Sequence, residues 1–225
     1  MRIIIVEDQL MFREAIRKAC VRELGHQVIG EAESGTVGVA LVTKYQPDVL
    51  LLDLSLPELD GFSVIERVKQ SAPATKIIVI SAYLDDYTVL NVDKAAIHGY
   101  IDKNTNQIQT LATALSAVEK GQRYFSPAYE SLRKSLLADS SWFAKLLSRT
   151  ELKVLELVGR GLDNSEIGCE LGISPRTAQA HRTSILQKLK LRGTPKLMIF
   201  ALERGFINRL SVRFSRKDKK TKNPS

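Results

Sequence analysis

The stretch Val49–Gly61, VLLLDLSLPELDG, decides how the first half of the chain folds. Its run of four apolar residues, Val49–Leu52, is typical of a short strand buried on both faces, as in parallel sheets. A carboxylate inside such a strand would lose its water at a large cost in free energy. We therefore expect the strand to end at Asp53, at the carboxyl edge of the sheet, where open α/β folds bind ligands. The alternative is an Asp that only caps the strand by accepting hydrogen bonds from loop amides.

Strand-like and helix-like patterns alternate around this stretch. Apolar residues at helical spacing separate the strand-like runs, and the last such group ends at Gly121. This alternation predicts an α/β fold, a doubly wound five-stranded parallel sheet of the flavodoxin-like type, over residues 1–120. The strands are expected at Arg2–Val6, His26–Ala32, Asp48–Leu52, Lys76–Ser81 and His98–Ile101.

Polar residues stand where these strands end. The pair Glu7–Asp8 follows the first strand, Asp53 follows the third, Ser81 ends the fourth and Lys103 follows the fifth. All these ends share one edge of a parallel sheet, so the side chains should converge there. An all-oxygen ligand set with few carboxylates suits Mg²⁺. One carboxylate could then act as a nucleophile toward a phosphoryl group.

The net charge differs sharply between the two halves of the chain. Residues 1–120 carry 12 Lys and Arg against 16 Asp and Glu, whereas residues 121–225 carry 21 against 9. The basic half favours a polyanionic partner, nucleic acid ahead of membrane. No apolar run is long enough to span a membrane and no signal peptide opens the chain, so we expect a cytoplasmic protein.

The second half has the pattern of a helix-turn-helix. Residues 121–147 are expected to form a linker with a helical piece around Ser131–Leu137. A short helix capped by Asn164 or Ser165 follows, then a tight turn at Gly172 and a longer basic helix with Ser174 as its cap and Pro175 at its first position. This predicts a small all-α domain over residues 148–210. Residues 211–225 are polar and basic without periodicity, and we expect them to be disordered.

Residues 1–120 resemble the receiver domain of two-component response regulators, through VEDQLMFREAI, DVLLLDLSLPELDGF, IIVISAY and GYIDKN. The resemblance implies that Asp53 is the phosphoacceptor and that Ser81 and Lys103 sense the phosphoryl group. Tyr100 stands at the position of an aromatic switch residue. The sequence departs from the family at Asp102, where relatives are more often apolar, and at Asn104, where many have proline. The implied Mg²⁺ ligands are Glu7, Asp8, Asp53 and, through its backbone carbonyl, Ser55.

Residues 148–207 are similar to the LuxR-type DNA-binding domain, from LSRTELKVLELVGRGLDNSEIGCELG to ISPRTAQAHRTSILQKLKL. Together with the receiver, this resemblance points to the NarL/FixJ family. Many members have Lys at the position of Gln179, so the base preference of relatives does not transfer. The residues expected to contact DNA are Arg176, Thr177, Gln179, Ala180, Arg182, Thr183 and Lys188.

The main hypothesis is a phosphorylation-controlled transcription regulator that is not an enzyme. A cognate histidine kinase would phosphorylate Asp53, and the phosphorylated homodimer would bind double-stranded DNA. One alternative is a phosphatase of similar build, which would need a general acid near Asp53. Another is a constitutive DNA-binding protein whose receiver only docks partners.

Overall fold

The structure is a computed structural model that describes residues 1–105 and 107–206. It divides into two compact units, one made of Met1–Leu84 with Thr88–Arg133, the other of Asp85–Tyr87 with the chain from Lys134 onward. The expected basic tail, residues 211–225, lies outside the described residues, as do the last residues of the predicted DNA-binding domain. No helix in the described part of the chain has both the length and the apolar character needed to cross a membrane.

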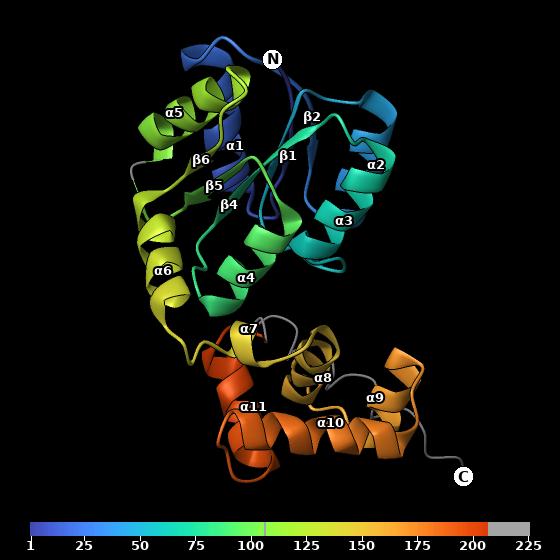
Figure 1. Ribbon diagram of the computed structural model, residues 1–225. Helices are drawn as coiled ribbons and strands as arrows, with labels where there is room; N and C mark the ends of the chain where they lie inside the picture. The colour runs from blue at the N-terminus through green and yellow to red at the C-terminus, as the bar shows by residue number, and fades with distance from the viewer. Residues whose placement is uncertain (106, 207–225) are drawn as a thin grey trace, which may run out of the picture. The chain divides into compact units, whose positions relative to one another are not determined.

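The first unit is built on a parallel sheet of six strands in the order β2-β1-β3-β4-β5-β6 (Figure 1). The doubly wound parallel fold is confirmed, because each neighbouring pair of strands is parallel and helices connect them. The third strand is buried at every position, as its apolar run predicts. The strands are β1 Arg2–Val6, β2 Gln27–Ala32, β3 Val49–Leu52, β4 Lys76–Ser81, β5 Gly99–Asp102 and β6 Tyr124–Phe125.

The expected number of five strands was wrong, because β6 pairs with β5 at the edge of the sheet. The backbone of Tyr124 donates to His98 O at 3.1 Å and that of Ser126 donates to Tyr100 O at 2.9 Å. A strand of two residues is too short to show an alternating pattern, so no periodicity in the sequence indicates it. Its formation still covers the exposed edge of β5, which would otherwise leave backbone groups unpaired.

Helices cover both faces of the sheet (Figure 1). One apolar cluster joins alternate strand residues to Ile16 of α1 and Leu115 of α5, so these two helices pack on the same face. Helices α2 and α3 lie on the opposite face (Figure 1). The helices of this unit are α1 Leu10–Lys18, continued by a π-helical turn at Ala19–Glu23, α2 Gly35–Tyr45, α3 Gly61–Ser71, α4 Asp86–Ala95, which belongs to this unit from Thr88 onward, and α5 Gln107–Glu119.

The segment expected as a linker contains more structure than its sequence pattern indicated. After β6, helix α6 runs over Pro127–Ala138 and so begins earlier than the predicted helical piece at Ser131–Leu137. Its Tyr129 side chain is fully buried and its hydroxyl donates to Asp93 Oδ1 of α4 at 2.9 Å. Arg133 Nε donates to the same carboxylate at 2.9 Å. The start of α6 is therefore part of the first unit.

The second unit contains the predicted helix-turn-helix. Helix α8 begins with a capping box between Ser148 and Glu151. The turn between α9 and α10 has Gly172 in the left-handed conformation, at φ 66°, which glycine adopts without strain. Ser174 caps α10 as expected, because its hydroxyl accepts from the backbone of Thr177 at 3.0 Å. The helices are α7 Phe143–Leu146, α8 Arg149–Gly159, α9 Asn164–Leu171, α10 Pro175–Lys188 and α11 Thr194–Glu203.

The expected cap of α9 was wrong. Neither Asn164 nor Ser165 caps this helix, because the Asp163 carboxylate accepts from the backbone amides of Ser165 and Glu166 at 2.8 Å each. Glu166 completes a capping box by accepting from the backbone of Asp163 at 2.8 Å. The helix thus begins at Asn164, earlier than the sequence suggested, and the Asn164 side chain is available for another contact.

Candidate functional site

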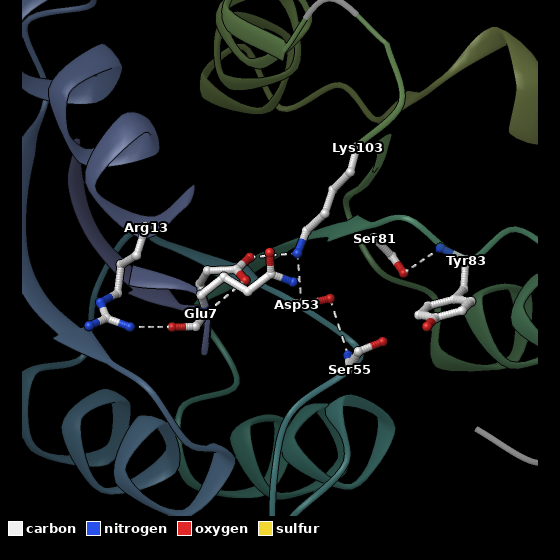
Figure 2. Close-up of polar contacts among 8 residues, drawn as sticks. Glu7, Arg13, Asp53, Ser55, Ser81, Tyr83 and Lys103 are labelled. Atoms are coloured by element: carbon white, nitrogen blue, oxygen red, sulfur yellow. Dashed lines mark hydrogen bonds and ion pairs between the residues drawn. The ribbon is translucent and has the colours of Figure 1, made fainter. Parts of the chain in front are cut away.

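The ends of β1, β3, β4 and β5 bring polar side chains together at one edge of the sheet (Figure 2). Carboxylate oxygens of Glu7, Asp8 and Asp53 all lie within 4.8 Å of one another. Lys103, which follows β5, points its ammonium group at Glu7 and Asp53 (Figure 2). The convergence that the strand ends predicted is therefore present in the structure.

Asp53 is held from both sides. Its Oδ2 accepts from Lys103 Nζ at 2.8 Å and its Oδ1 accepts from the backbone amide of Ser55 at 3.1 Å. The side chain is almost fully buried. Gly61 lets helix α3 start against this loop, because a Cβ at that position would lie 2.8 Å from the carbonyl oxygen of Asp53 and 2.6 Å from Cα of Leu54. The loop after β3 thereby fixes the direction in which the Asp53 carboxylate points.

Lys103 is shared between two carboxylates. Its Nζ lies 2.7 Å from Glu7 Oε2 as well as 2.8 Å from Asp53 Oδ2, and 4.5 Å from the ring centre of Phe12. Burial alone would lower the pKa of Lys103, but the charge of Asp53 and the hydrogen bonds to both carboxylates outweigh it and raise the pKa. The lysine is therefore firmly charged and supplies one positive charge to a cluster of three acids.

Glu7 shows that one positive charge does not balance this cluster. Burial, and then repulsion from Asp53, raise the pKa of Glu7 to about 7 despite the contact with Lys103. Its Oε1 accepts from the backbone of Gln9 at 3.2 Å, and Arg13 Nη1 binds its backbone oxygen at 2.6 Å (Figure 2). Asp8 is exposed and completes the opening of the site toward solvent. A site with this excess of negative oxygen ligands can hold a hard divalent cation.

Ser81 and Tyr100 lie on the neighbouring strands β4 and β5, and both contact the backbone of Tyr83. The Ser81 hydroxyl accepts from the backbone of Tyr83 at 3.1 Å, and Tyr100 donates from its hydroxyl to the carbonyl of Tyr83 at 2.6 Å. Tyr100 is fully buried, and its ring centre lies 5.0 Å from that of Tyr129 in α6. Asp102 contacts its own loop, because its Oδ1 accepts from the backbone and the side-chain amide of Asn104, at 2.8 and 2.9 Å.

Helix α10 presents most of the residues expected to contact DNA to solvent. Ala178 and Ile185 are fully buried and define its inner face. Arg182 is half-buried and belongs to the flank of the helix. The exposed residues of the predicted set are Arg176, Thr177, Gln179, Ala180, Thr183 and Lys188.

Lys188 has a partner inside the second unit. Its Nζ lies 2.7 Å from Oε2 of Glu151 in α8, a carboxylate with only 4% of its surface exposed. The Ser184 hydroxyl donates to Oε1 of the same side chain at 2.7 Å. The structure therefore gives Lys188 a role in joining α10 to α8, and its predicted contact with DNA phosphates stays a prediction.

Comparison with known families decides what these two units are. Residues 3–116 match the response regulator receiver domain, and residues 145–201 match the LuxR family of bacterial regulatory proteins. The chain is a response regulator. Its combination of a receiver with a LuxR-type domain is that of the NarL/FixJ type, which regulates transcription by binding DNA in two-component systems.

The response regulator is similar to characterised proteins over almost its whole length. It is 31% identical to the oxygen regulatory protein NreC of Staphylococcus carnosus strain TM300, over 92% of this chain and 100% of NreC. It is also similar to the structure of RcsB from Salmonella enterica serovar Typhimurium bound to promoter rprA in the presence of the phosphomimetic BeF3⁻. That match has 27% identity and a TM-score of 0.66, over 89% of this chain and 97% of the RcsB chain. A structure of two RcsB dimers bound to two parallel DNAs matches with 27% identity and a TM-score of 0.62, over 90% and 98% of the two chains.

Two residues of the response regulator escaped sequence reasoning. The signal for Glu151 is its position three residues after Ser148, which is the signature of a capping box. The sequence indicates Asn164 only as a candidate cap, whereas its side chain contacts both Gln179 and Arg182 of α10. No sequence signal identifies that contact, because it joins two helices through side chains that are 15 and 18 residues apart.

Proposed function

We propose that a histidine kinase transfers a phosphoryl group to Asp53 of this response regulator. The observation that carries the proposal is the Asp53 carboxylate at the sheet edge, held by Lys103 and Ser55 and surrounded by two further acids. In this step a carboxylate oxygen attacks phosphorus and the bond from phosphorus to the kinase's histidine nitrogen breaks. That nitrogen keeps the electron pair and takes up a proton. The response regulator itself then serves as a phosphoacceptor and not as an enzyme.

The acids around Asp53 fit a Mg²⁺ ion. Glu7, Asp8 and Asp53 offer oxygen ligands within 4.8 Å of one another, and the raised pKa of Glu7 reflects a negative charge that Lys103 alone does not offset. With the backbone carbonyl of Ser55, these residues would hold the ion. When bound, Mg²⁺ supplies positive charge to the oxygens of an incoming phosphoryl group.

Ser81 and Lys103 are the proposed sensors of the phosphoryl group, and Tyr100 is the proposed switch. The Ser81 hydroxyl and the Tyr100 hydroxyl both bind the backbone of Tyr83. A movement of Ser81 toward the phosphate would therefore shift Tyr83 and change its hydrogen bond with Tyr100. The contact between the rings of Tyr100 and Tyr129 extends this connection to α6. Phosphorylation would thereby bias a segment that leads out of the receiver.

The second unit is proposed to read paired DNA half-sites as a homodimer. The supporting features are the exposed polar face of α10 and the net positive charge of residues 121–225, which carry 21 Lys and Arg against 9 Asp and Glu. We assign the receiver to residues 1–120, the linker to 121–147 and the DNA-binding domain to 148–210, with the first part of the linker, β6 and the start of α6, packed in the same compact unit as the receiver. The proposed DNA contacts are Arg176, Thr177, Gln179, Ala180, Arg182, Thr183 and Lys188. We propose that the protein acts in the cytoplasm, where it would reach DNA.

Labelling with acetyl phosphate tests the phosphoacceptor. With Mg²⁺, mass spectrometry should show a gain of about 80 Da, one phosphoryl group, on the peptide that contains Asp53. Asp53→Asn should remove the label, and chelation of Mg²⁺ should remove it as well. Asp48→Asn, an exposed aspartate at the other end of β3, is the matched control and should keep the label. Equal labelling of Asp53→Asn would refute the assignment.

A further inference from the structure

Asn164 connects the two helices of the helix-turn-helix through polar side chains of α10. Its Nδ2 donates to Oε1 of Gln179 at 2.6 Å, and its Oδ1 accepts from Nη1 of Arg182 at 2.8 Å. Because Asp163 caps α9, the Asn164 side chain is not needed at the helix end. One side chain of α9 thus holds two of the side chains expected to contact DNA.

We propose that Asn164 is a specificity-determining residue, which fixes the orientation of the Gln179 amide and thereby the base that α10 prefers. This inference rests on the proposed function, since it concerns how the second unit reads DNA. Asn164 acts through Gln179 and is therefore a positioning residue. Nothing in the resemblance to LuxR-type domains implies it, because many members carry Lys at the position of Gln179, and a lysine has no oxygen to accept from Asn164.

The direction of each amide follows from the chemistry of Arg182. A guanidinium group only donates hydrogen bonds, so Asn164 must turn its oxygen toward Arg182. The Asn164 nitrogen then faces Gln179, whose side-chain oxygen must accept the hydrogen bond. The Gln179 nitrogen is left on the far side, where Nε2 lies 3.5 Å from the hydroxyl oxygen of Thr183. Arg182 thus decides which atom of each amide donates and which accepts along this series of contacts.

A fixed amide has a consequence for base recognition. Gln can bind adenine with two hydrogen bonds, in which its nitrogen donates to N7 and its oxygen accepts from N6. Oε1 of Gln179 keeps a second lone pair beyond the one that Asn164 uses, and Nε2 keeps a hydrogen for a base. The exposed amide therefore offers its donor and acceptor in one order only. An unrestrained amide could turn over and offer them in the opposite order, which would weaken the discrimination between bases.

Arg182 takes part in this arrangement from a half-buried position. Burial lowers its pKa, although the group stays a cation in proteins, and its Nη1 is already engaged by Asn164. Arg182 thereby supports the orientation of Gln179, besides the DNA contact proposed for it. Because the three side chains form one chain of contacts, substitution at Asn164 should affect the same base pair as substitution at Gln179.

Selection of bound sequences from a randomised duplex pool tests the proposal on the full chain treated with acetyl phosphate. Gln179→Ala first identifies the base pair that Gln179 reads, as the position where preference is lost in each half-site. Asn164→Ala should reduce preference at that same position by about tenfold, the order expected for one bidentate contact, and leave the other positions unchanged. Ser165→Ala, an exposed neighbour on α9, is the matched control and should keep the preference of the unsubstituted chain.

A second variant gives a readout that mere support of the fold would not produce. In Asn164→Asp the carboxylate still accepts from Arg182 but has no hydrogen to donate, so Gln179 should turn its nitrogen inward. The preferred base at the Gln179 position should then change, whereas in Asn164→Ala the preference should only flatten. Circular dichroism melting of each variant checks that the domain stays folded.

The outcomes separate the inference from the proposed function. If Asn164→Ala keeps the original preference, or weakens all sequences alike, Asn164 does not set specificity and the inference is overturned while DNA reading stands. If the phosphorylated unsubstituted chain selects no common motif, the proposed DNA reading itself fails. If Asn164→Ala does not fold, Asn164→Asp decides: an unchanged preferred base overturns the inference and a changed one supports it.

Discussion

Glu7 and Glu151 are two buried glutamates in two different units that resemble each other in their nearest contact. Glu7 is 1% exposed and Glu151 is 4% exposed, and each has a lysine nitrogen 2.7 Å from its Oε2. Their pKa values nevertheless move in opposite directions. The pKa of Glu7 rises to about 7 and that of Glu151 falls to about 2. The lysine at ion-pair distance therefore does not decide the charge state by itself.

The difference lies in what else surrounds each carboxylate. Burial raises the pKa of Glu7, Asp53 raises it further, and the two acids compete for one lysine. Burial would also raise the pKa of Glu151, but hydrogen bonds from Lys188, from the backbone of Ser148 and from the Ser184 hydroxyl outweigh it. A satisfied carboxylate supports the fold, whereas a cluster with excess negative charge is suited to bind a cation.

The largest expected effect on stability is at Glu151, the carboxylate whose hydrogen bonds outweigh its burial. Glu151→Gln should lower the free energy of unfolding of the second unit by about 2–3 kcal/mol, because it leaves Lys188 without its charge partner and weakens the cap of α8. Urea unfolding followed by the fluorescence of Trp142, the single tryptophan, reports on this unit. Glu203→Gln, at the exposed end of α11, is the control and should change little.

Acid should have a corresponding effect on the second unit. Since the folded pKa of Glu151 is about 2 against an ordinary value of 4.5, its contribution to stability is complete above pH 4.5 and is lost as the pH falls toward 2. Glu151→Gln should remove this part of the pH dependence. A variant that keeps the full acid sensitivity would show that the stabilisation of Glu151 comes from elsewhere.

Mg²⁺ should produce an effect of similar size, and only on the first unit. At a concentration 100 times its Kd, a bound ion stabilises the folded state by about 2.7 kcal/mol. We therefore expect Mg²⁺ to raise the unfolding temperature of the receiver in scanning calorimetry. Asp8→Asn, which removes one of the three clustered carboxylates, should abolish most of the increase. An equal increase for the unsubstituted chain and for Asp8→Asn would place the ion elsewhere.

Glu7→Gln should have the smallest effect, and this is the sharpest test of the comparison. Because the pKa of Glu7 is about 7, a neutral side chain is already tolerated there, and the substitution also relieves repulsion with Asp53. Without divalent cations the free energy of unfolding should change by less than about 1 kcal/mol in either direction. A loss as large as that of Glu151→Gln would mean that both glutamates are structural and that the contrast is false.

The strand-end cluster could be predicted because sequence and topology together determine it. The run Val49–Leu52 had to be buried, so Asp53 had to stand at the strand's end, and parallel strands place their ends on one edge. The cap at Ser174 was predictable for a similar reason, since it depends on neighbours in the chain. Strand β6 was not, because its two residues are selected by the open edge of β5 and not by a pattern of their own.

The sequence by itself determined the first five strands and their order, the helix-turn-helix, the acids at the sheet edge and the basic character of the second half. Only the tertiary structure decided how individual polar groups are shared. It showed that Lys103 serves both Glu7 and Asp53, that Lys188 is paired with Glu151, and that Asn164 stands between Gln179 and Arg182. The physical reason is range: periodicity and capping act between residues a few positions apart. Ion pairs and side-chain hydrogen bonds depend on distances of about 3 Å between elements that only packing brings together.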